Sequence, residues 1–551
     1  MATKIYMAFG GPGCGKSTFC EGVAANLIES GVPLDQIVYT TFQRSAAIQA
    51  ASRAGISYEQ YHDLWYRTLH SACYKLLGIE GDRIVTPDKM RDFSKEVGVR
   101  IDRALSVEDD EMADLAEIML AVQKDSDPDS ADAQASRIIS VYHKSRLASR
   151  TEHEFSMCRK EPHPAAVAQI TGLFDGGAYT SLVAEYENWK QSNGLLDFTD
   201  MIERALFGAI ERPPWKYVFV DEAQDLSSAQ WRLVEVLFFN GPNAVFLAGD
   251  DNQAIMNFQM AKASDFLSYR SVATRIMLRK THRFGRSISD LGDRIVSRLS
   301  EREARDMIPA DISSVVEEAF DFDYSLKSYP QGKKFLLHRH KIGCAMIAKE
   351  MIARGVPFWN ERGVNPLART TEIGVYRAIK KMMSGEQVFA LDAANIAKGV
   401  PSMTTRGGEK IRLIKHGSKK DLDLMDPNKP LSRAELQVHF TEPLWKSIQA
   451  GDWSVADVEF PGYYEAIERD GWDFAADRRP DAIIATIHAS KGREADDVFL
   501  WDEVLPRCLS DETEHRVAYV GATRAKRRLC VVRSPITPWS TTHYSYPVAT
   551  R

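Results

Sequence analysis

The sequence predicts an α/β fold with parallel sheets, and short runs of hydrophobic residues are the main reason. Each run is hydrophobic throughout, without alternation, and ends in glycine or polar residues. Continuous hydrophobicity is typical of strands buried on both faces, as in a parallel sheet flanked by helices. The runs are Ile5–Phe9, Tyr217–Val220, Ala244–Ala248, Lys334–Leu337, Ile483–Ile487, Val498–Trp501 and Leu529–Val532.

Helices are also visible between these strands. Apolar residues recur at helical spacing from Phe19 to Ile28, and Gly31 stands where a helix commonly ends. A chain of 551 residues exceeds one hydrophobic core, because single domains usually hold roughly 100–200 residues. The strands fall into two groups with long segments inside each. We therefore expect two α/β domains, each interrupted by an inserted subdomain.

The composition excludes several classes of protein. Hydrophobic residues make up 44% and charged residues 26%, as in ordinary globular proteins, and a net charge of −6 excludes a histone-like polycation. No apolar run approaches the roughly 20 residues of a membrane helix, and the N-terminus lacks the basic start of a signal peptide. The seven cysteines include no CxxC pair, which argues against structural zinc, an iron–sulfur cluster and a disulfide framework. We expect a cytoplasmic protein with no membrane partner.

A glycine-rich segment after the first strand has the pattern of a phosphate-binding loop. Gly10–Thr18 reads GGPGCGKST and lies between a predicted strand and a predicted helix, as the P-loop pattern requires. Backbone N–H groups of such a loop surround phosphate oxygens, and the helix N-terminus favours negative charge. Lys16 would reach the β- and γ-phosphates of ATP, and the Ser17 hydroxyl would bind Mg²⁺. The expected nucleotide contacts here are Gly10, Gly11, Gly13, Gly15, Lys16, Ser17 and Thr18.

Two further strands end in polar residues that suit the same chemistry. Tyr217–Val220 is followed by Asp221, which would bind Mg²⁺, and Glu222, which would polarise the attacking water. The third strand is followed by Gln253, which is placed in the sequence to sense a γ-phosphate. Each segment alone is also compatible with a charged or polar turn at a strand end. The P-loop favours the catalytic interpretation.

Further segments, in order along the chain, carry a family resemblance. Together with the three sites above, they resemble the motifs of superfamily 1 helicases of the UvrD/Rep/PcrA type over nearly the whole chain. The matching segments are Thr41–Ala47 (motif Ia), Arg67–Ser71 (the TFH segment), Leu196–Asp200 (the LDFxD segment), Leu278–Arg283 (motif IV), Thr486–Glu494 (motif V) and Ala518–Ala525 (motif VI).

The resemblance implies two RecA-like P-loop NTPase domains with parallel sheets, each carrying an inserted, mainly helical or mixed subdomain. The second insertion would be shorter than in typical members. Its basic stretch from Arg406 to Lys420 could grip duplex phosphates or form a solvated loop. The expected boundaries are 1–84 and 191–275 for the first RecA-like domain, 85–190 for its helical insertion, 276–364 and 481–551 for the second, and 365–480 for the reduced insertion.

The resemblance also implies roles for residues of the second domain. Arg283 and Arg524 would reach the γ-phosphate, because a planar, permanently charged guanidinium suits the charge spread over a transferring phosphoryl group. Glu494 would contact the ribose, although a solvated glutamate is the alternative. His282 stands where the family has a tyrosine that stacks on the nucleotide base, and imidazole stacks more weakly.

In this family single-stranded DNA lies across both domains, with bases stacked on aromatic side chains. Stacking tolerates any sequence, because every base has a π-face. Phe42, Phe198 and Phe258 match the aromatic positions, and core packing is the alternative for each. His70 and His488 lie in segments that line the strand path, or they are structural histidines.

Several positions depart from the family pattern. Met256 replaces a tyrosine of motif III, so one stacking platform is lost, and we keep it among the expected DNA contacts. Gln259 replaces an arginine, which removes a phosphate contact. The family's adenine-reading glutamine lies further ahead of the P-loop than the nine residues that precede Gly10 here. Selectivity for ATP over other nucleotides is therefore open.

The expected function is ATP-driven, 3′→5′ movement along single-stranded DNA that separates strands at single-strand/duplex junctions, with ATP and Mg²⁺ as cofactors. One alternative is a translocase that displaces proteins or loads factors without productive unwinding, which the short second insertion favours. Another is an ATP-gated ssDNA-binding factor with low turnover, against which Glu222 and the two arginines argue. RNA is an alternative strand, since stacking accepts either sugar. The sequence indicates no protein partner.

Overall fold

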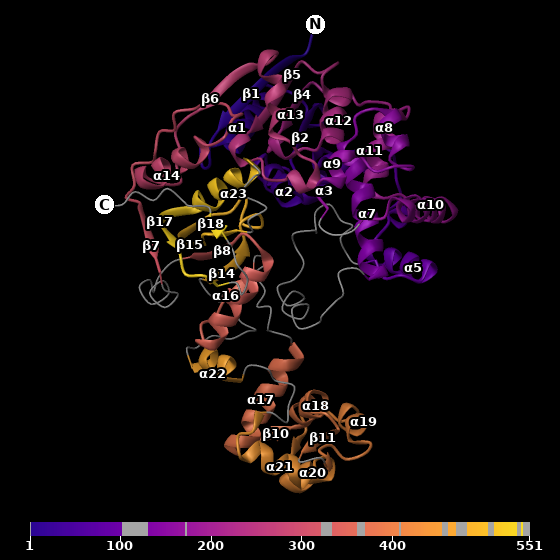
Figure 1. The fold of residues 1–551 in the computed structure, drawn as a ribbon, viewed down its shortest axis with the longest axis vertical. Helices are drawn as coiled ribbons and strands as arrows, with labels where there is room; N and C mark the ends of the chain where they lie inside the picture. The colour runs from indigo at the N-terminus through magenta and orange to yellow at the C-terminus, as the bar shows by residue number, and fades with distance from the viewer. Residues whose placement is uncertain are drawn as a thin grey trace.

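The computed structural model describes residues 2–101, 130–170, 174–320, 333–360, 370–406, 409–453, 461–469, 482–504, 512–536 and 542–543. Within these ranges the chain forms two six-stranded parallel sheets with helices around them, which confirms the predicted α/β fold class (Figure 1). None of the helices in these ranges combines the length and the apolar character needed to cross a bilayer.

The first sheet has the strand order β3-β2-β4-β5-β1-β6. Its central strands are buried almost throughout, which explains why they read as continuous hydrophobic runs. Because β1, β4 and β5 are parallel neighbours, the loops that follow Gly10, Val220 and Gly249 emerge at one edge. The strands are β1 (Lys4–Gly10), β2 (Ile37–Thr40), β3 (Trp65–Arg67), β4 (Tyr217–Val220), β5 (Ala244–Gly249) and β6 (Thr274–Leu278).

Helices on both faces complete this first unit. Several begin at side-chain caps that the sequence supplies: Thr68 accepts a hydrogen bond from Ser71 N–H, and Ser227 forms a capping box with Gln230. The helices are α1 (Lys16–Glu29), α2 (Arg44–Arg53), α3 (Tyr58–Tyr61), α4 (Leu69–Leu76), α11 (Phe198–Phe207), α12 (Ser228–Phe238) and α13 (Ala263–Leu267).

The second sheet has the order β7-β17-β15-β8-β14-β9 and is also parallel. Helices α14 and α23 pack against each other beside it. The strands are β7 (Val315–Ala319), β8 (Lys334–His338), β9 (Trp359–Asn360), β14 (Ala482–Thr486), β15 (Ala495–Trp501) and β17 (Ala525–Val532). The helices are α14 (Arg286–Val296), α16 (Lys341–Ala353) and α23 (Glu512–Ala522), and β16 (Glu503–Val504) pairs antiparallel with β18 (Thr542–His543).

The chain between β3 and β4 is helical in its described parts, and it shares a hydrophobic core with the first sheet. Figure 1 shows these helices gathered at one side of that sheet. Besides α4 and α11, they are α5 (Pro87–Val97), α7 (Ala131–Ala148), α8 (Glu152–Met157), α9 (Pro164–Val167) and α10 (Gly176–Ser192).

A second lobe lies between β9 and β14. Most of it stands away from both sheets in Figure 1, while its last helix, α22, contacts α16. The basic stretch expected in this region begins in an antiparallel hairpin, in which Lys410 faces Thr405 and Arg412 faces Met403. The elements are α17 (Thr370–Ser384), β10 (Val388–Phe389), α18 (Ala390–Gly399), β11 (Met403–Arg406), β12 (Glu409–Arg412), α19 (Ser418–Asp423), β13 (Pro430–Leu431), α20 (Arg433–His439), α21 (Glu442–Gln449) and α22 (Pro461–Arg469).

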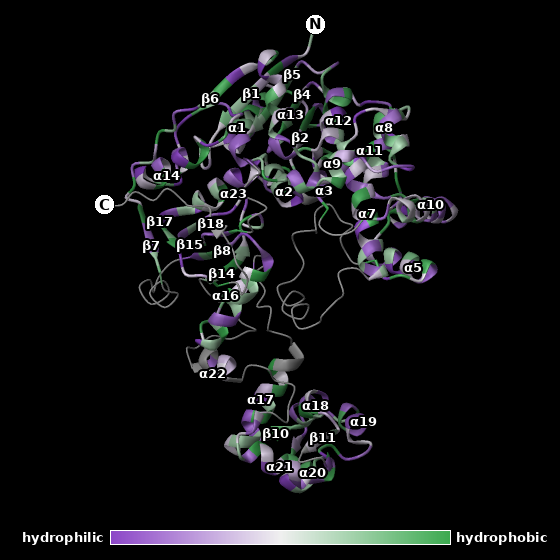
Figure 2. Cartoon of the chain, in the orientation of Figure 1, coloured by the Kyte–Doolittle hydropathy of each residue, from purple (hydrophilic) through white to green (hydrophobic). Residues whose placement is uncertain are grey.

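The hydropathy of the chain follows this layering. Figure 2 shows hydrophobic strands inside and helices of mixed colour around them. The predicted boundary between the two domains, at 275/276, falls inside a strand of the first sheet. This strand, β6, pairs with β1 from Tyr6↔Thr274 to Gly10↔Leu278.

Candidate active site

The P-loop is folded for phosphate binding by its glycines. Gly13 and Gly15 have φ angles of 72° and 78°, in the left-handed region that glycine adopts without strain. The Lys16 ammonium donates to the carbonyl oxygens of Gly10, at 3.1 Å, and Gly11, at 3.5 Å. The Lys16 side chain is therefore held inside its own loop, where a phosphate would compete for it.

The loop is also packed against the segment that follows β6. A Cβ atom on Gly13 would lie 2.6 Å from the Cβ atom of Arg283, and one on Gly11 would lie 2.3 Å from the sulfur of Met307. The backbone N–H of His282 donates to the Gly13 carbonyl at 2.9 Å. Gly13 is thus required by close approach as well as by its left-handed backbone, whereas the contact at Gly11 is with a flexible methionine side chain.

Asp221 and Glu222 lie at the end of β4, beside the P-loop. Burial, and then the neighbouring Glu222, raise the pKa of Asp221 to about 6, against a hydrogen bond from Ser17 that lowers it. Tyr39 also donates to the Asp221 carboxylate at 3.1 Å. The Ser17 hydroxyl and the Asp221 carboxylate thus form a pair of oxygen ligands of the kind that Mg²⁺ prefers.

Glu222 is held in an unusual backbone conformation. Its φ of 52° is left-handed, which non-glycine residues adopt infrequently and mostly at functional positions. Its carboxylate accepts a hydrogen bond from Gln224 Nε2 at 2.6 Å. Although burial alone raises it, the charges of Lys16 and then Lys491 hold the pKa of Glu222 below its usual value. An ionised Glu222 is suited to accept a proton from water.

Gln253 and Arg524 meet across the two sheets. Gln253 Nε2 donates to Asp250 at 2.6 Å, and its Oε1 accepts from Arg524 Nη2 at 2.8 Å. The Arg524 side chain is almost fully buried, and burial, followed by the charge of Arg283, lowers its pKa to about 9. Two guanidinium groups held this close favour an anionic ligand between them.

The second arginine is paired with the expected ribose contact. Arg283 Nε donates to Glu494 at 2.8 Å, and Arg283 Nη1 donates to the Thr523 carbonyl at 3.1 Å. Glu494 also pairs with Lys526 at 2.8 Å. His282, the expected base-stacking residue, is exposed. Residues of both sheets that were expected at the nucleotide site therefore lie together where the loops of the two sheets meet, a region that we call the cleft.

A buried ion pair that sequence reasoning did not assign also spans this cleft. Lys491 Nζ lies 2.5 and 2.6 Å from the Asp225 carboxylate oxygens and donates to the Gln253 carbonyl at 2.7 Å. Burial raises the pKa of Asp225 to about 6, against the opposing charge of Lys491. Lys491 belongs to the motif V segment and Asp225 stands three residues after Glu222, which was the available signal. We call Asp225, Asp250, Gln253, Lys491 and Arg524 the cleft network.

Two models of known protein families match parts of this chain. A family model for the UvrD/REP helicase N-terminal domain matches residues 2–273, and a second, for the UvrD-like helicase C-terminal domain, matches 481–532. The chain belongs to the UvrD/Rep/PcrA type of superfamily 1 helicases.

Curated relatives of this helicase family are similar at a modest level. A protein from Staphylococcus epidermidis named "ATP-dependent DNA helicase PcrA" is 22% identical over 377 residues, covering 63% of this chain and 48% of the relative. A Staphylococcus aureus protein of the same name is 24% identical over 309 residues, covering 54% and 38%. The chain thus spans about half the length of the first of these relatives and less of the second.

Four of the six residues expected along the family's DNA path form two aromatic pairs. His70 and Phe198 meet edge to face with centroids 5.9 Å apart, and Phe258 and His488 do so at 5.8 Å. Phe198 is 37% exposed, whereas Met256 is only 6% exposed and offers little surface for stacking. A small pocket beside the first pair is lined by Thr41, Phe42, Thr68, Leu69, His70, Leu226 and Gln230.

The histidines of these pairs are neutral. Burial lowers the pKa of His70 to about 4 and lowers the pKa of His488 well below its usual value. Within the described residues, His70 Nε2 has no hydrogen-bond partner. His70 therefore presents an uncharged ring beside the Phe42 pocket.

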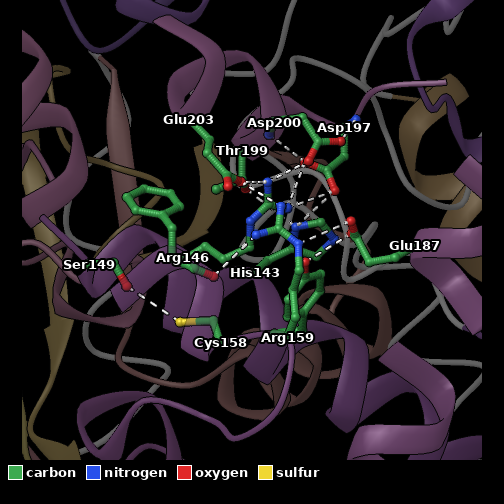
Figure 3. Close-up of polar contacts among 12 residues, drawn as sticks. His143, Arg146, Ser149, Cys158, Arg159, Glu187, Asp197, Thr199, Asp200 and Glu203 are labelled. Carbon is green, nitrogen blue, oxygen red and sulfur yellow. Dashed lines mark hydrogen bonds and ion pairs between the residues drawn. The ribbon is translucent and has the colours of Figure 1, made fainter. Parts of the chain in front are cut away.

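The acids of the LDFxD segment have a structural role that the sequence did not reveal. Asp197 and Asp200 cap α11 reciprocally, each accepting the other's backbone N–H at 2.8 Å. Arg146 of α7 pairs with both carboxylates (Figure 3). Lys190 of α10 pairs with both as well. We call Arg146, Lys190, Asp197, Asp200 and Glu203 the insertion network.

The insertion network fixes the start of α11, where Phe198 is the first residue. Oxygens of Glu187, Asp197 and Asp200 lie close enough together to share a metal ion. However, Lys190 Nζ already lies 2.7 Å from both aspartates, and the Arg146 guanidinium, whose side chain is fully buried, pairs with Glu203 at 2.8 Å. The acids are thus neutralised by side chains of the protein.

Proposed function

We propose that this chain is an ssDNA-stimulated ATPase that moves 3′→5′ along single-stranded DNA and separates strands at duplex junctions. The observation that carries the proposal is the cleft itself. Lys16, Glu222 and Gln253 extend from the first sheet toward Arg283 and Arg524 of motifs IV and VI. Hydrolysis then requires both halves of the cleft, so nucleotide state is coupled to their separation.

The residues present fit a Mg²⁺–nucleotide complex. Ser17 and Asp221 would hold the metal, because both offer oxygen ligands and already contact each other. The metal would neutralise charge on the phosphates. The free N–H groups at the start of α1 would receive the phosphates, and Lys16 would exchange the Gly10 and Gly11 carbonyls for phosphate oxygens.

The other cleft residues supply the remaining steps. Glu222 would take the proton of the attacking water through its free carboxylate oxygen, while Gln224 holds the other oxygen. Arg283 and Arg524 would stabilise charge on the transferring phosphoryl group. To do so, Arg283 would give up part of its contact with Glu494, and Arg524 part of its contact with Gln253. These exchanges would change the contacts across the cleft at every turnover.

On the DNA side, the exposed ring of Phe198 and the half-buried rings of Phe42 and Phe258 would stack with bases. Phe258 packs on His488 of motif V, so this aromatic pair links the two sheets. Because Phe258 and Phe198 both belong to the first-sheet unit, a change of the cleft would instead move His488 and motif V relative to both platforms, and so change the path of the bases.

The first experiment is steady-state NTP hydrolysis with and without poly-dT, for the wild type and Glu222→Gln. We expect strong stimulation by poly-dT in the wild type and its loss in the variant, with binding of a fluorescent ATP analogue retained. Arg527→Ala, which removes an exposed arginine, is the matched control. Wild-type turnover that poly-dT does not stimulate would overturn the proposal.

Further arms of this experiment resolve the finer questions. GTP and CTP test base selectivity, and matched RNA and DNA oligonucleotides test strand preference. Unwinding of forked duplexes with 3′ or 5′ tails tests polarity. Displacement of streptavidin from the same tails without unwinding would instead favour the protein-displacing translocase.

A further inference from the structure

A segment outside the recognised motifs runs along the cleft. After α14 the chain returns past the P-loop, where Ile308 exchanges backbone hydrogen bonds of 2.9 Å with Arg279 and Thr281. Met307 fills the space above Gly11, and Arg516 of α23 donates to the Glu301 carbonyl at 2.8 Å. The segment from Glu301 to Ile308 is therefore fixed between the P-loop and the second sheet's helix.

Arg305 projects from this segment into the loop after β5. Its side chain is 4% exposed, and its guanidinium lies 2.9 Å from the Asp250 carboxylate and pairs with Asp251 as well. The Glu303 backbone N–H donates to the other Asp251 oxygen at 2.8 Å. Asp250 and Asp251 are adjacent acids with no exposed surface, and the guanidinium of Arg305 is a cation paired with both of them.

Asp250 in turn orients Gln253. A side-chain amide has one donor end and one acceptor end, and an ionised carboxylate can only accept. The Asp250 carboxylate takes the Nε2 donor at 2.6 Å, which leaves Oε1 facing Arg524 at 2.8 Å. The Asp250 backbone N–H also donates to Gln224 at 2.9 Å, and Gln224 holds Glu222.

We propose that Arg305 is a positioning residue for ATP hydrolysis: through Asp250 it sets the orientation of Gln253, and thereby the place of Arg524. This inference rests on the proposed function. Arg305 acts here through Asp250 and not by contact with the nucleotide. Its guanidinium holds the Asp250 carboxylate in place, so that the amide Nε2 of Gln253 stays on Asp250 and its Oε1 stays toward Arg524.

A double-mutant cycle tests this role. The variants are Arg305→Ala, Arg305→Lys, Gln253→Ala and the Arg305→Ala/Gln253→Ala pair, with Arg527→Ala as control. We expect Arg305→Ala to lower kcat for poly-dT-stimulated hydrolysis at least tenfold, with KM for ATP changed less than threefold. Arg305→Lys keeps the charge and should recover most of kcat. The double variant should have the kcat of Gln253→Ala alone, because coupled residues are not additive.

The outcomes separate the inference from the proposed function. Effects of Arg305→Ala and Gln253→Ala that multiply in the double variant would overturn the inference, as would wild-type kcat in Arg305→Ala. Loss of nucleotide-analogue binding with a lowered melting temperature in both Arg305 variants would also overturn it, in favour of a purely structural role. Failure of the wild type to hydrolyse ATP would instead reject the proposed function.

Discussion

The cleft network and the insertion network are both buried and charged. The insertion network joins helices of one structural unit, whereas the cleft network joins two units. The insertion network links α7, α10 and α11, whose apolar residues share one core with the first sheet. The cleft network links loops of the first sheet to residues of the second, which has its own cores. Burial of charge therefore does not identify function by itself.

The partners of each charge carry the distinction. In the insertion network, Arg146 and Lys190 meet the same two aspartates, so its charges are saturated within one body. In the cleft, Lys491 is likewise paired with Asp225. Lys16, however, rests on carbonyl oxygens, and Arg524 rests on carbonyl oxygens and the Gln253 amide oxygen, which are weaker partners than a phosphate. The insertion network therefore stabilises the fold, whereas Lys16 and Arg524 in the cleft can exchange their present partners for a phosphate.

Removal of a charged residue from the cleft should have the largest effect of all, and this effect should be on the rate of ATP hydrolysis. Arg524→Ala should lower kcat for DNA-stimulated hydrolysis by about 10³- to 10⁵-fold, the effect typical of an arginine that stabilises the transferring phosphoryl group. The free energy of unfolding should change little, because burial disfavours the charged form of Arg524 in the folded protein, as its lowered pKa indicates. Steady-state kinetics and thermal unfolding of the same preparation check both parts, with Arg527→Ala beside them. A kcat within tenfold of wild type would contradict the assignment.

Breaking the insertion network should cost stability. Arg146→Met leaves Asp197, Asp200 and Glu203 short of a cation in a buried site, which should destabilise by about 3–5 kcal/mol. Urea unfolding measures the loss, with Arg204→Met, at an exposed site on α11, as control. Unchanged unfolding of Arg146→Met would show that the cluster contributes no net stability.

The platform that the insertion network supports should show a smaller effect, on DNA affinity. Phe198→Ala should weaken binding of a labelled dT oligonucleotide by the roughly 1–3 kcal/mol of one stacked base, or about 5- to 150-fold. Fluorescence anisotropy at fixed salt measures it. Phe207→Ala, at the other end of α11 and similarly exposed at 36%, is the control and should bind normally. Equal loss in both would argue against stacking at Phe198.

An exposed ion pair gives the smallest expected effect, and it serves as a reference for the stability change at the buried pairs. Arg53 pairs with Glu21 at 2.9 Å between α1 and α2, and its side chain is 58% exposed. Solvent screens such pairs, so Arg53→Ala should change stability by less than about 1 kcal/mol. Thermal unfolding beside Arg146→Met checks the contrast. A loss as large as that of Arg146→Met would remove the distinction between buried and exposed pairs.

Much of the fold was predictable because it follows from local pattern. Continuous apolar runs marked the buried strands, and the glycines of the P-loop marked a turn that needs left-handed residues. The sequence did not predict that β6 belongs to the first sheet, because the pairing of Thr274–Leu278 with β1 depends on which edge of a sheet is free to accept a strand. Nor did it predict the burial of Met256, which replaces a stacking residue without keeping its exposure.

The ionic partners were the least predictable part of the site. Arg146 lies 51 residues before Asp197, and nothing in its own neighbourhood marks it as the partner of a motif residue. Arg305 is likewise 54 residues from Asp251. Such pairs depend on how helices and loops meet in three dimensions. A sequence pattern shows only that the acids are present.

The pairing of β6 with β1 has a consequence for the two arginines. Arg283 follows the end of β6 at Leu278 by five positions, and an extended chain reaches at most about 3.6 Å per residue, or about 18 Å here. Arg524 immediately precedes β17, an interior strand of the other sheet. Arg283 therefore lies within this radius of the end of β6, while Phe284 and α14, which follow it, pack in a core of the second sheet. Arg283 thus stands on the short connection between the two sheets, so its distance from the P-loop sheet stays bounded as the cleft widens. The position of Arg524 is instead set by the second sheet alone.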